Sequence, residues 1–159
     1  MPTQMLRVGL VGYGFAGQTF HAPVLAAVPG VQLVAVASSQ PDKVRADWPA
    51  MAVVPDVQAL LALEPGVDLI VVATPNEAHY PVARGALAAG RHVVVDKPFT
   101  LDSGEARDLV DLARANGRLV SVYQNRRFDS DFLTLRQTLA DGLVGRPVYF
   151  ESHFDRYRP

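Results

Sequence analysis

Residues 8–23 read VGLVGYGFAGQTFHAP, in which an apolar run is followed by three closely spaced glycines. The run Leu6–Val11 has the composition of a buried strand, and the segment after the glycines has the composition of a helix. A G-x-G-x-x-G between a strand and a helix is typical of a loop that lets the backbone approach phosphates. We expect Gly12 to make the turn, Gly14 to admit the phosphates and Gly17 to let the helix pack against the strand.

The rest of the chain alternates short apolar runs with Ala-rich amphipathic segments. Several of the runs are apolar throughout, as in strands that are buried on both faces. This alternation predicts an α/β fold, namely a doubly wound, mostly parallel Rossmann sheet with helices on both faces. The expected strands are 6–11, 31–37, 52–54, 69–73, 92–95 and 119–123, and the expected helices are about 16–28, 41–47, 56–63, 76–89, 102–116 and 129–141.

The overall composition limits the classes of partner. The chain has 159 residues, of which 49% are hydrophobic, and its formal net charge of −1 provides no basic field for nucleic acid. The absence of cysteine excludes disulfides and thiolate metal sites, and no His, Asp and Glu have metal-ligand spacing. The N-terminus does not resemble a signal peptide, and the longest apolar stretch, residues 69–73, is too short to span a bilayer. We therefore expect a cytoplasmic protein that binds neither metal, nucleic acid nor membrane.

The loop after the second expected strand bears on the choice of dinucleotide. NAD-binding folds of this kind usually place an acidic side chain there for the ribose 2′-hydroxyl, whereas this chain has Ser38 and Ser39. Two hydroxyls can donate to a 2′-phosphate, and Lys43 or Arg45 can pair with it. The loop therefore favours NADP over NAD, and the alternative is a Ser-Ser helix cap before Pro41.

Three other expected strands also end in polar residues. Ligands of doubly wound sheets bind beyond the carboxyl ends of the strands, so these residues are candidates for one site. We expect Asn76 to cap the following helix and His79 to face the cofactor, and the Lys97–Pro98 bond is a candidate for the cis form. The three segments are ATPNEAH at 73–79, VDKPF at 95–99 and YQNRRFD at 123–129.

Together, the segments GYGFAG, ATPNEAH, DKP and YQNRRFDSDF resemble the glucose–fructose oxidoreductase/inositol dehydrogenase/MocA (Gfo/Idh/MocA) family of NAD(P)-dependent dehydrogenases. The resemblance covers essentially the whole chain and is strongest to the branch that acts on inositols and related sugars. It implies hydride transfer between a nicotinamide cofactor and a sugar or polyol hydroxyl. The cofactor contacts that we expect from the loops and the resemblance are Gly12, Tyr13, Gly14, Phe15, Ala16, Gly17, Ser38, Ser39, Lys43, Thr74, Pro75, Asn76, His79, Asp96, Lys97, Pro98, Gln124 and Asn125.

The resemblance also implies a catalytic role for Lys97, in contact with the nicotinamide ribose or the substrate hydroxyl. The alternative is a surface ion pair between Lys97 and Asp96, which stands where the family usually has Glu. His21, two residues before Pro23, is more readily explained as a packed or solvated residue than as a residue on the substrate side.

The sequence pattern changes towards the C-terminus. We expect residues 1–125 to form the Rossmann domain, 126–145 a linking helix and 146–159 the first strand of an α/β substrate domain that is otherwise missing. The resemblance implies that this domain supplies the catalytic base, so the chain alone is expected to bind cofactor but to be inactive. A stand-alone, non-enzymatic NADP(H)-binding or sensing module is the alternative. Residues 147–157, without a sheet to join, are expected to be disordered or to pair with another copy in a homo-oligomer.

Overall fold

The computed structural model describes residues 5–155 and 157. The chain divides into two compact units, of which the first ends at Tyr123 and the second begins at Gln124.

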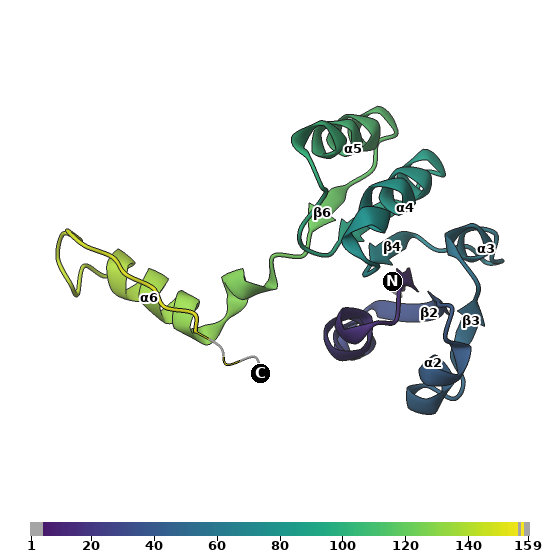
Figure 1. The fold of residues 1–159 in the computed structure, drawn as a ribbon, viewed down its shortest axis with the longest axis horizontal. Helices are drawn as coiled ribbons and strands as arrows, with labels where there is room; N and C mark the ends of the chain where they lie inside the picture. The colour runs from purple at the N-terminus through teal and green to yellow at the C-terminus, as the bar shows by residue number, and fades with distance from the viewer. Residues whose placement is uncertain (1–4, 156, 158–159) are drawn as a thin grey trace. The chain divides into compact units, whose positions relative to one another are not determined.

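The first unit is built on a six-stranded sheet in the order β3-β2-β1-β4-β5-β6 (Figure 1). Every pair of neighbouring strands is parallel, which confirms the doubly wound Rossmann sheet expected from the sequence. The strand order reverses between β1 and β4, so a crevice is expected beyond the carboxyl ends of these strands. The strands are β1 (Leu6–Val11), β2 (Val31–Ala37), β3 (Ala52–Val54), β4 (Leu69–Val72), β5 (His92–Val95) and β6 (Val120–Val122).

The helices of this unit follow the expected positions closely. The expected helix 16–28 is a π-helical segment that continues directly into an α-helix. Helices α4 and α5 lie side by side (Figure 1). The elements are η1 (Gly17–His21), α1 (Ala22–Ala27), α2 (Pro41–Asp47), α3 (Val57–Leu61), α4 (Asn76–Ala88) and α5 (Ser103–Ala115).

Side-chain caps form at two of these helix starts but not at a third. The Asp102 carboxylate accepts hydrogen bonds from the N–H groups of Gly104 and Glu105, which is a common way to cap a helix start. Asp56 caps α3 in the same way. The prediction that Asn76 caps α4 is wrong, because Asn76 is already the first helical residue and Pro75 occupies the cap position.

Two apolar clusters cover the two faces of the sheet. On β4, Ile70 and Val72 pack into one cluster with residues of α3, α4 and α5, while Val71 packs into the other with Val44 of α2. Successive side chains of a strand point to opposite faces. The strands are therefore apolar throughout because both faces are covered by helices.

The second unit contains a short 3-10 helix, η2 (Asn125–Phe128), and α6 (Ser130–Ala140), the helix expected at 129–141. The described residues of the segment 146–157 form neither helix nor strand, so the strand expected there is not present in this structure. A strand needs a neighbour for its N–H and C=O groups, and none of the described strands pairs with this segment. Its alternating residues Val148 and Phe150 are exposed. Its assignment to a further domain, and its pairing with another copy, stay predictions.

No helix in the described part of the chain is long and apolar enough to cross a membrane.

Candidate functional site

The three glycines of the first loop have distinct steric roles. Gly12 has φ of 99°, and a Cβ there would collide with the carbonyl oxygen of Ala73. A Cβ on Gly17 would collide with the carbonyl oxygen of Gly12. A Cβ on Gly14 would meet nothing within 4 Å. The first and third glycines are therefore required by the turn itself, whereas the second leaves the backbone open to an approaching group.

A recess of about 600 Å³ lies at the carboxyl ends of β1, β2 and β4. It brings together the glycine loop, the serine pair and the turn after β4, as the sequence predicted. The predicted residues that line it are Gly12, Tyr13, Gly14, Phe15, Ala16, Ser38, Ser39, Lys43, Thr74 and Pro75. Pro55 and Asp56 also line it and were not predicted. They follow the short strand β3, so the rule that ligands bind beyond strand ends would have found them.

The serine pair and Lys43 lie beside the glycine loop. The Lys43 ammonium donates a hydrogen bond to the Tyr13 carbonyl oxygen at 3.1 Å. Ser38 Oγ accepts a hydrogen bond from the Gln40 N–H at 3.0 Å, which stabilises the turn before α2. No side-chain cap bond forms at the start of α2, so the alternative of a serine cap is not supported. Arg45 pairs instead with Asp42 at 3.9 Å and does not line the recess.

The Tyr13 hydroxyl is directed away from the recess. It donates to Asp47 Oδ2 at 2.9 Å and accepts a hydrogen bond from Trp48 Nε1 at 2.8 Å. Burial, together with the hydrogen bond to Asp47, raises the pKa of Tyr13 to about 12. The hydroxyl therefore keeps its proton at neutral pH, and its hydrogen bonds are made with Asp47 at the end of α2 and with Trp48.

His79 is buried between two turns and does not line the recess. Its Nδ1 lies 2.8 Å from the Pro98 carbonyl oxygen, and its Nε2 lies 3.0 Å from the Thr74 carbonyl oxygen. The structure does not place His79 at the recess, because both ring nitrogens lie against backbone carbonyls, and its contact with the cofactor stays a prediction. The residue connects the turn after β4 to the turn after β5.

The turn after β5 contains Asp96, Lys97 and Pro98. The Lys97–Pro98 bond is cis, and the Lys97 side chain is exposed. Asp96 accepts a hydrogen bond from the Lys97 backbone N–H at 2.7 Å. Within the described residues, no ion pair joins the Lys97 ammonium to Asp96. The Asp96 carboxylate instead faces the ring of His21, with 3.6 Å between Oδ2 and Nε2.

His21 is a buried residue, as the sequence favoured. Its side chain is 3% exposed, and its ring centroid lies 4.3 Å from that of Tyr123. Burial lowers the pKa of His21, and the nearby Asp96 carboxylate opposes this effect only in part. The folded protein therefore favours the neutral imidazole.

This pKa shift predicts a loss of stability in mild acid. The pKa of His21 is lower in the folded chain than its unfolded value of about 6.5, so the unfolded chain binds more protons in the window below that value. The free energy of unfolding should be fully retained above about pH 6.5 and should fall as the pH is lowered through this window. Urea unfolding at about pH 7 and about pH 5 measures the difference. His21→Gln should reduce the pH dependence and the control His92→Gln should preserve it; an unchanged dependence in His21→Gln would contradict the assignment.

The remaining predicted residues lie outside the recess. Asn76 is exposed at the start of α4, and Gly17 is buried under the glycine loop. Gln124 and Asn125 belong to the second unit, where Asn125 begins η2, and their contact with the nicotinamide stays a prediction. Within the described residues, no three His, Cys, Asp or Glu side chains are grouped so as to hold a metal ion.

Residues 6–124, which include the glycine loop and the turns after β2, β4 and β5, match the Gfo/Idh/MocA family model, described as an oxidoreductase family with an NAD-binding Rossmann fold. The chain belongs to the Gfo/Idh/MocA family. The resemblance inferred from the four sequence segments is thereby confirmed.

Relatives of this Gfo/Idh/MocA chain are known as proteins and as structures. It is 55% identical to the uncharacterized oxidoreductase YdgJ of Escherichia coli, over 97% of this chain and 44% of YdgJ. It is 34% identical to scyllo-inositol 2-dehydrogenase (NADP(+)) IolW of Bacillus subtilis, over 97% of this chain and 43% of IolW. A solved oxidoreductase from Yersinia pestis matches with a TM-score of 0.94 at 56% identity, over 98% of this chain and 44% of that one. The chain thus spans less than half the length of these relatives.

Proposed function

We propose that the recess binds NADP(H) and that the protein transfers hydride between this cofactor and a sugar or polyol hydroxyl. The observation that carries the choice of cofactor is the grouping of Ser38, Ser39 and Lys43 on one side of the recess. A 2′-phosphate carries negative charge and accepts hydrogen bonds, which suits two hydroxyls and an ammonium. Asp56 also lines the recess, but its carboxylate accepts a hydrogen bond from the Ala59 N–H as the cap of α3.

Two further observations support a dinucleotide in this recess. Gly14 leaves space beside the backbone where a pyrophosphate can approach, and a volume of about 600 Å³ is within the range of cofactor sites. Thr74 lines the recess, and its buried hydroxyl has no hydrogen-bond partner among the described residues. Buried polar groups usually have a partner, so this hydroxyl is a candidate for a ligand contact.

The substrate class is proposed from the family and from the turn after β5. When bound, the nicotinamide supplies the chemistry of hydride transfer. The exposed Lys97 would donate a hydrogen bond to the substrate hydroxyl and could hold or pass on a proton at Nζ. A sugar or polyol is favoured because the name of the relative IolW gives an inositol as substrate and NADP(+) as cofactor. Because the chain spans under half of that relative, the activity of the whole protein is part of the proposal.

Titration with NADPH and with NADH tests the choice of cofactor. We expect tighter binding of NADPH. We expect Lys43→Ala to weaken NADPH binding about ten- to a hundredfold while changing NADH binding little, because charged hydrogen bonds contribute about 1.5–3 kcal/mol. Arg45→Ala is the matched control, since Arg45 lies on the same helix but outside the recess. Tighter binding of NADH by the wild-type chain would contradict the proposed NADP preference.

The substrate class is tested by incubating the chain with NADP and inositols and following the absorbance of NADPH. The same assay is repeated on a longer protein, in which the C-terminal part of a relative is joined to this chain. The comparison shows whether an absence of turnover is due to the missing domain or to the wrong substrate. Turnover of inositols only by the longer protein would support the proposal, and turnover by neither would contradict the inositol assignment.

A further inference from the structure

The side chains that flank the glycine segment 14–17 on both sides bind the same carboxylate oxygen of Asp47. Asp47 Oδ2 accepts a hydrogen bond from the Tyr13 hydroxyl at 2.9 Å and another from Gln18 Nε2 at 2.6 Å. Tyr13 immediately precedes Gly14, and Gln18 immediately follows Gly17. Trp48 donates to the Tyr13 hydroxyl from the position after Asp47. We refer to Tyr13, Gln18, Asp47 and Trp48 as the α2 clamp.

We propose that the α2 clamp holds the glycine loop in the conformation that binds the cofactor. The Tyr13 hydroxyl is the group through which the clamp positions the loop. This inference rests on the proposed function, because it assumes that the recess binds a dinucleotide. The clamp residues act through the loop backbone, since the Tyr13 hydroxyl is already occupied by Asp47 and Trp48.

Contacts that order the glycine loop before the cofactor arrives are expected to favour binding. Glycine loses more conformational freedom on ordering than other residues, so a free loop of this composition would bind phosphates at a large entropic cost. Gly14 and Phe15 are exposed, and Phe15 packs edge-on against Phe20 on the following helical segment, with 5.5 Å between the ring centroids. The clamp fastens the loop at both ends while leaving the backbone of Gly14 open.

The same tyrosine contacts the residue proposed to bind the 2′-phosphate. Lys43 donates to the Tyr13 carbonyl oxygen and lies 5.9 Å above the centre of the Tyr13 ring. A change from Tyr13 to Phe keeps the backbone carbonyl and the ring, and it removes only the hydroxyl. The Lys43 contacts should therefore survive, so binding of both dinucleotides should weaken without a change in the preference between them.

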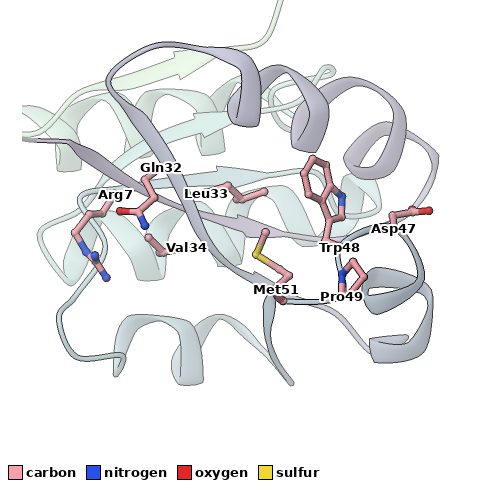
Figure 2. A pocket seen from close by; sticks show the side chains of 9 residues that line it. Arg7, Gln32, Leu33, Val34, Asp47, Trp48, Pro49 and Met51 are labelled. Atoms are coloured by element: carbon pink, nitrogen blue, oxygen red, sulfur yellow. The ribbon is translucent and has the colours of Figure 1, made fainter.

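Two residues of the α2 clamp, Asp47 and Trp48, also line a second groove. Figure 2 shows Asp47 and Trp48 next to each other, at the border of a groove of about 500 Å³ that also includes Leu33 and Met51. None of the residues lining this groove belongs to the glycine loop. Substitution of Asp47 or Trp48 would alter this groove as well, so Tyr13, which does not line it, is the first position for a test.

The first experiment compares Tyr13→Phe with Tyr80→Phe. Tyr80 also donates its hydroxyl to an aspartate, Asp108 Oδ2 at 3.0 Å, but it lies on α4 outside the recess. Both changes should lower the free energy of unfolding, and Tyr13→Phe should do so by more, because its buried hydroxyl makes two hydrogen bonds. Only Tyr13→Phe should raise the dissociation constants of NADPH and NADH, each by about three- to tenfold, the range expected for one hydrogen bond. Unchanged dinucleotide binding in Tyr13→Phe would overturn the proposal.

The second experiment uses the carboxylate. Asp47→Asn keeps an oxygen that can accept from Tyr13 and Gln18, so it should bind dinucleotides nearly as the wild type does, whereas Asp47→Ala should bind as weakly as Tyr13→Phe or more weakly. In the double variant of Tyr13→Phe and Asp47→Ala, the two effects on binding should be less than additive, because both changes break the same hydrogen bond. Full additivity would contradict the clamp.

Failure of the clamp and failure of the proposed function give different results. Absence of NADPH and NADH binding by the wild-type chain would contradict the proposed function. The clamp is then examined without cofactor, through backbone amide exchange of residues 14–17. Exchange there should be faster in Tyr13→Phe than in Tyr80→Phe, and equal exchange in the two variants would overturn the clamp.

Discussion

Gly12→Ala is expected to lower the free energy of unfolding by about 3 kcal/mol and to abolish dinucleotide binding. The backbone of Gly12 has φ of 99°, where an L-residue is strained by about 1–2 kcal/mol. The added Cβ would also collide with the Ala73 carbonyl oxygen at the end of β4, and overpacking of this kind costs about 1–3 kcal/mol. Urea unfolding and NADPH titration measure the two effects.

Gly14→Ala is the matched control for this prediction. A Cβ on Gly14 would meet nothing within 4 Å, so the free energy of unfolding should stay close to that of the wild type. The methyl group would occupy the place where we propose that the pyrophosphate approaches, and the dissociation constant of NADPH should rise at least about tenfold. Equal loss of stability in the two variants would show that the steric roles assigned to the two glycines are wrong.

His79→Phe is expected to lower the free energy of unfolding by about 2–3 kcal/mol. The change removes the ring nitrogens that lie against the carbonyl oxygens of Pro98 and Thr74, and each buried acceptor left without a partner costs about 1–3 kcal/mol. A neutral imidazole donates from only one nitrogen at a time, so the expected loss stays below the sum of two full hydrogen bonds. Urea unfolding gives the magnitude.

His92→Phe serves as the control for this change. The His92 ring is half-buried and accepts one hydrogen bond, from the Leu119 N–H at 3.0 Å. Its replacement should lower the free energy of unfolding by about 1 kcal/mol and leave NADPH binding unchanged. His79→Phe should also weaken NADPH binding, because the Thr74 turn lines the recess. The role assigned to His79 would be contradicted if the two variants lost equal stability and bound NADPH equally well.

Features that depend only on residues close together in the sequence could be predicted from it. The strands β1, β2, β3 and β5 have the predicted bounds, because apolar and β-branched runs are typical of buried parallel strands. The steric roles of Gly12 and Gly17 were also predictable, because a strand-to-helix turn with this glycine spacing typically needs a tight turn and a close approach of backbone segments. The cap by Asp102 follows from the same kind of local rule.

The strand expected in residues 146–159, of which 156, 158 and 159 lie outside the described residues, shows the limit of local rules. Its alternating pattern is compatible with a strand, but the described residues form none. A strand is stabilised by hydrogen bonds to a neighbour that can lie anywhere in the chain, so alternation of side chains alone does not produce it.

The sequence by itself determined the parallel α/β sheet, the family and the location of the recess at the strand ends. Only the tertiary structure decided which side chains meet there. His79 turns to two carbonyls instead of the recess, Asp96 faces His21 instead of the Lys97 ammonium, and the Tyr13 hydroxyl bonds Asp47, 34 residues away. Apart from Thr74, which is close to His79 in the chain, these partners are distant in sequence. They meet because the helices pack on the sheet, and no local pattern specifies such a meeting.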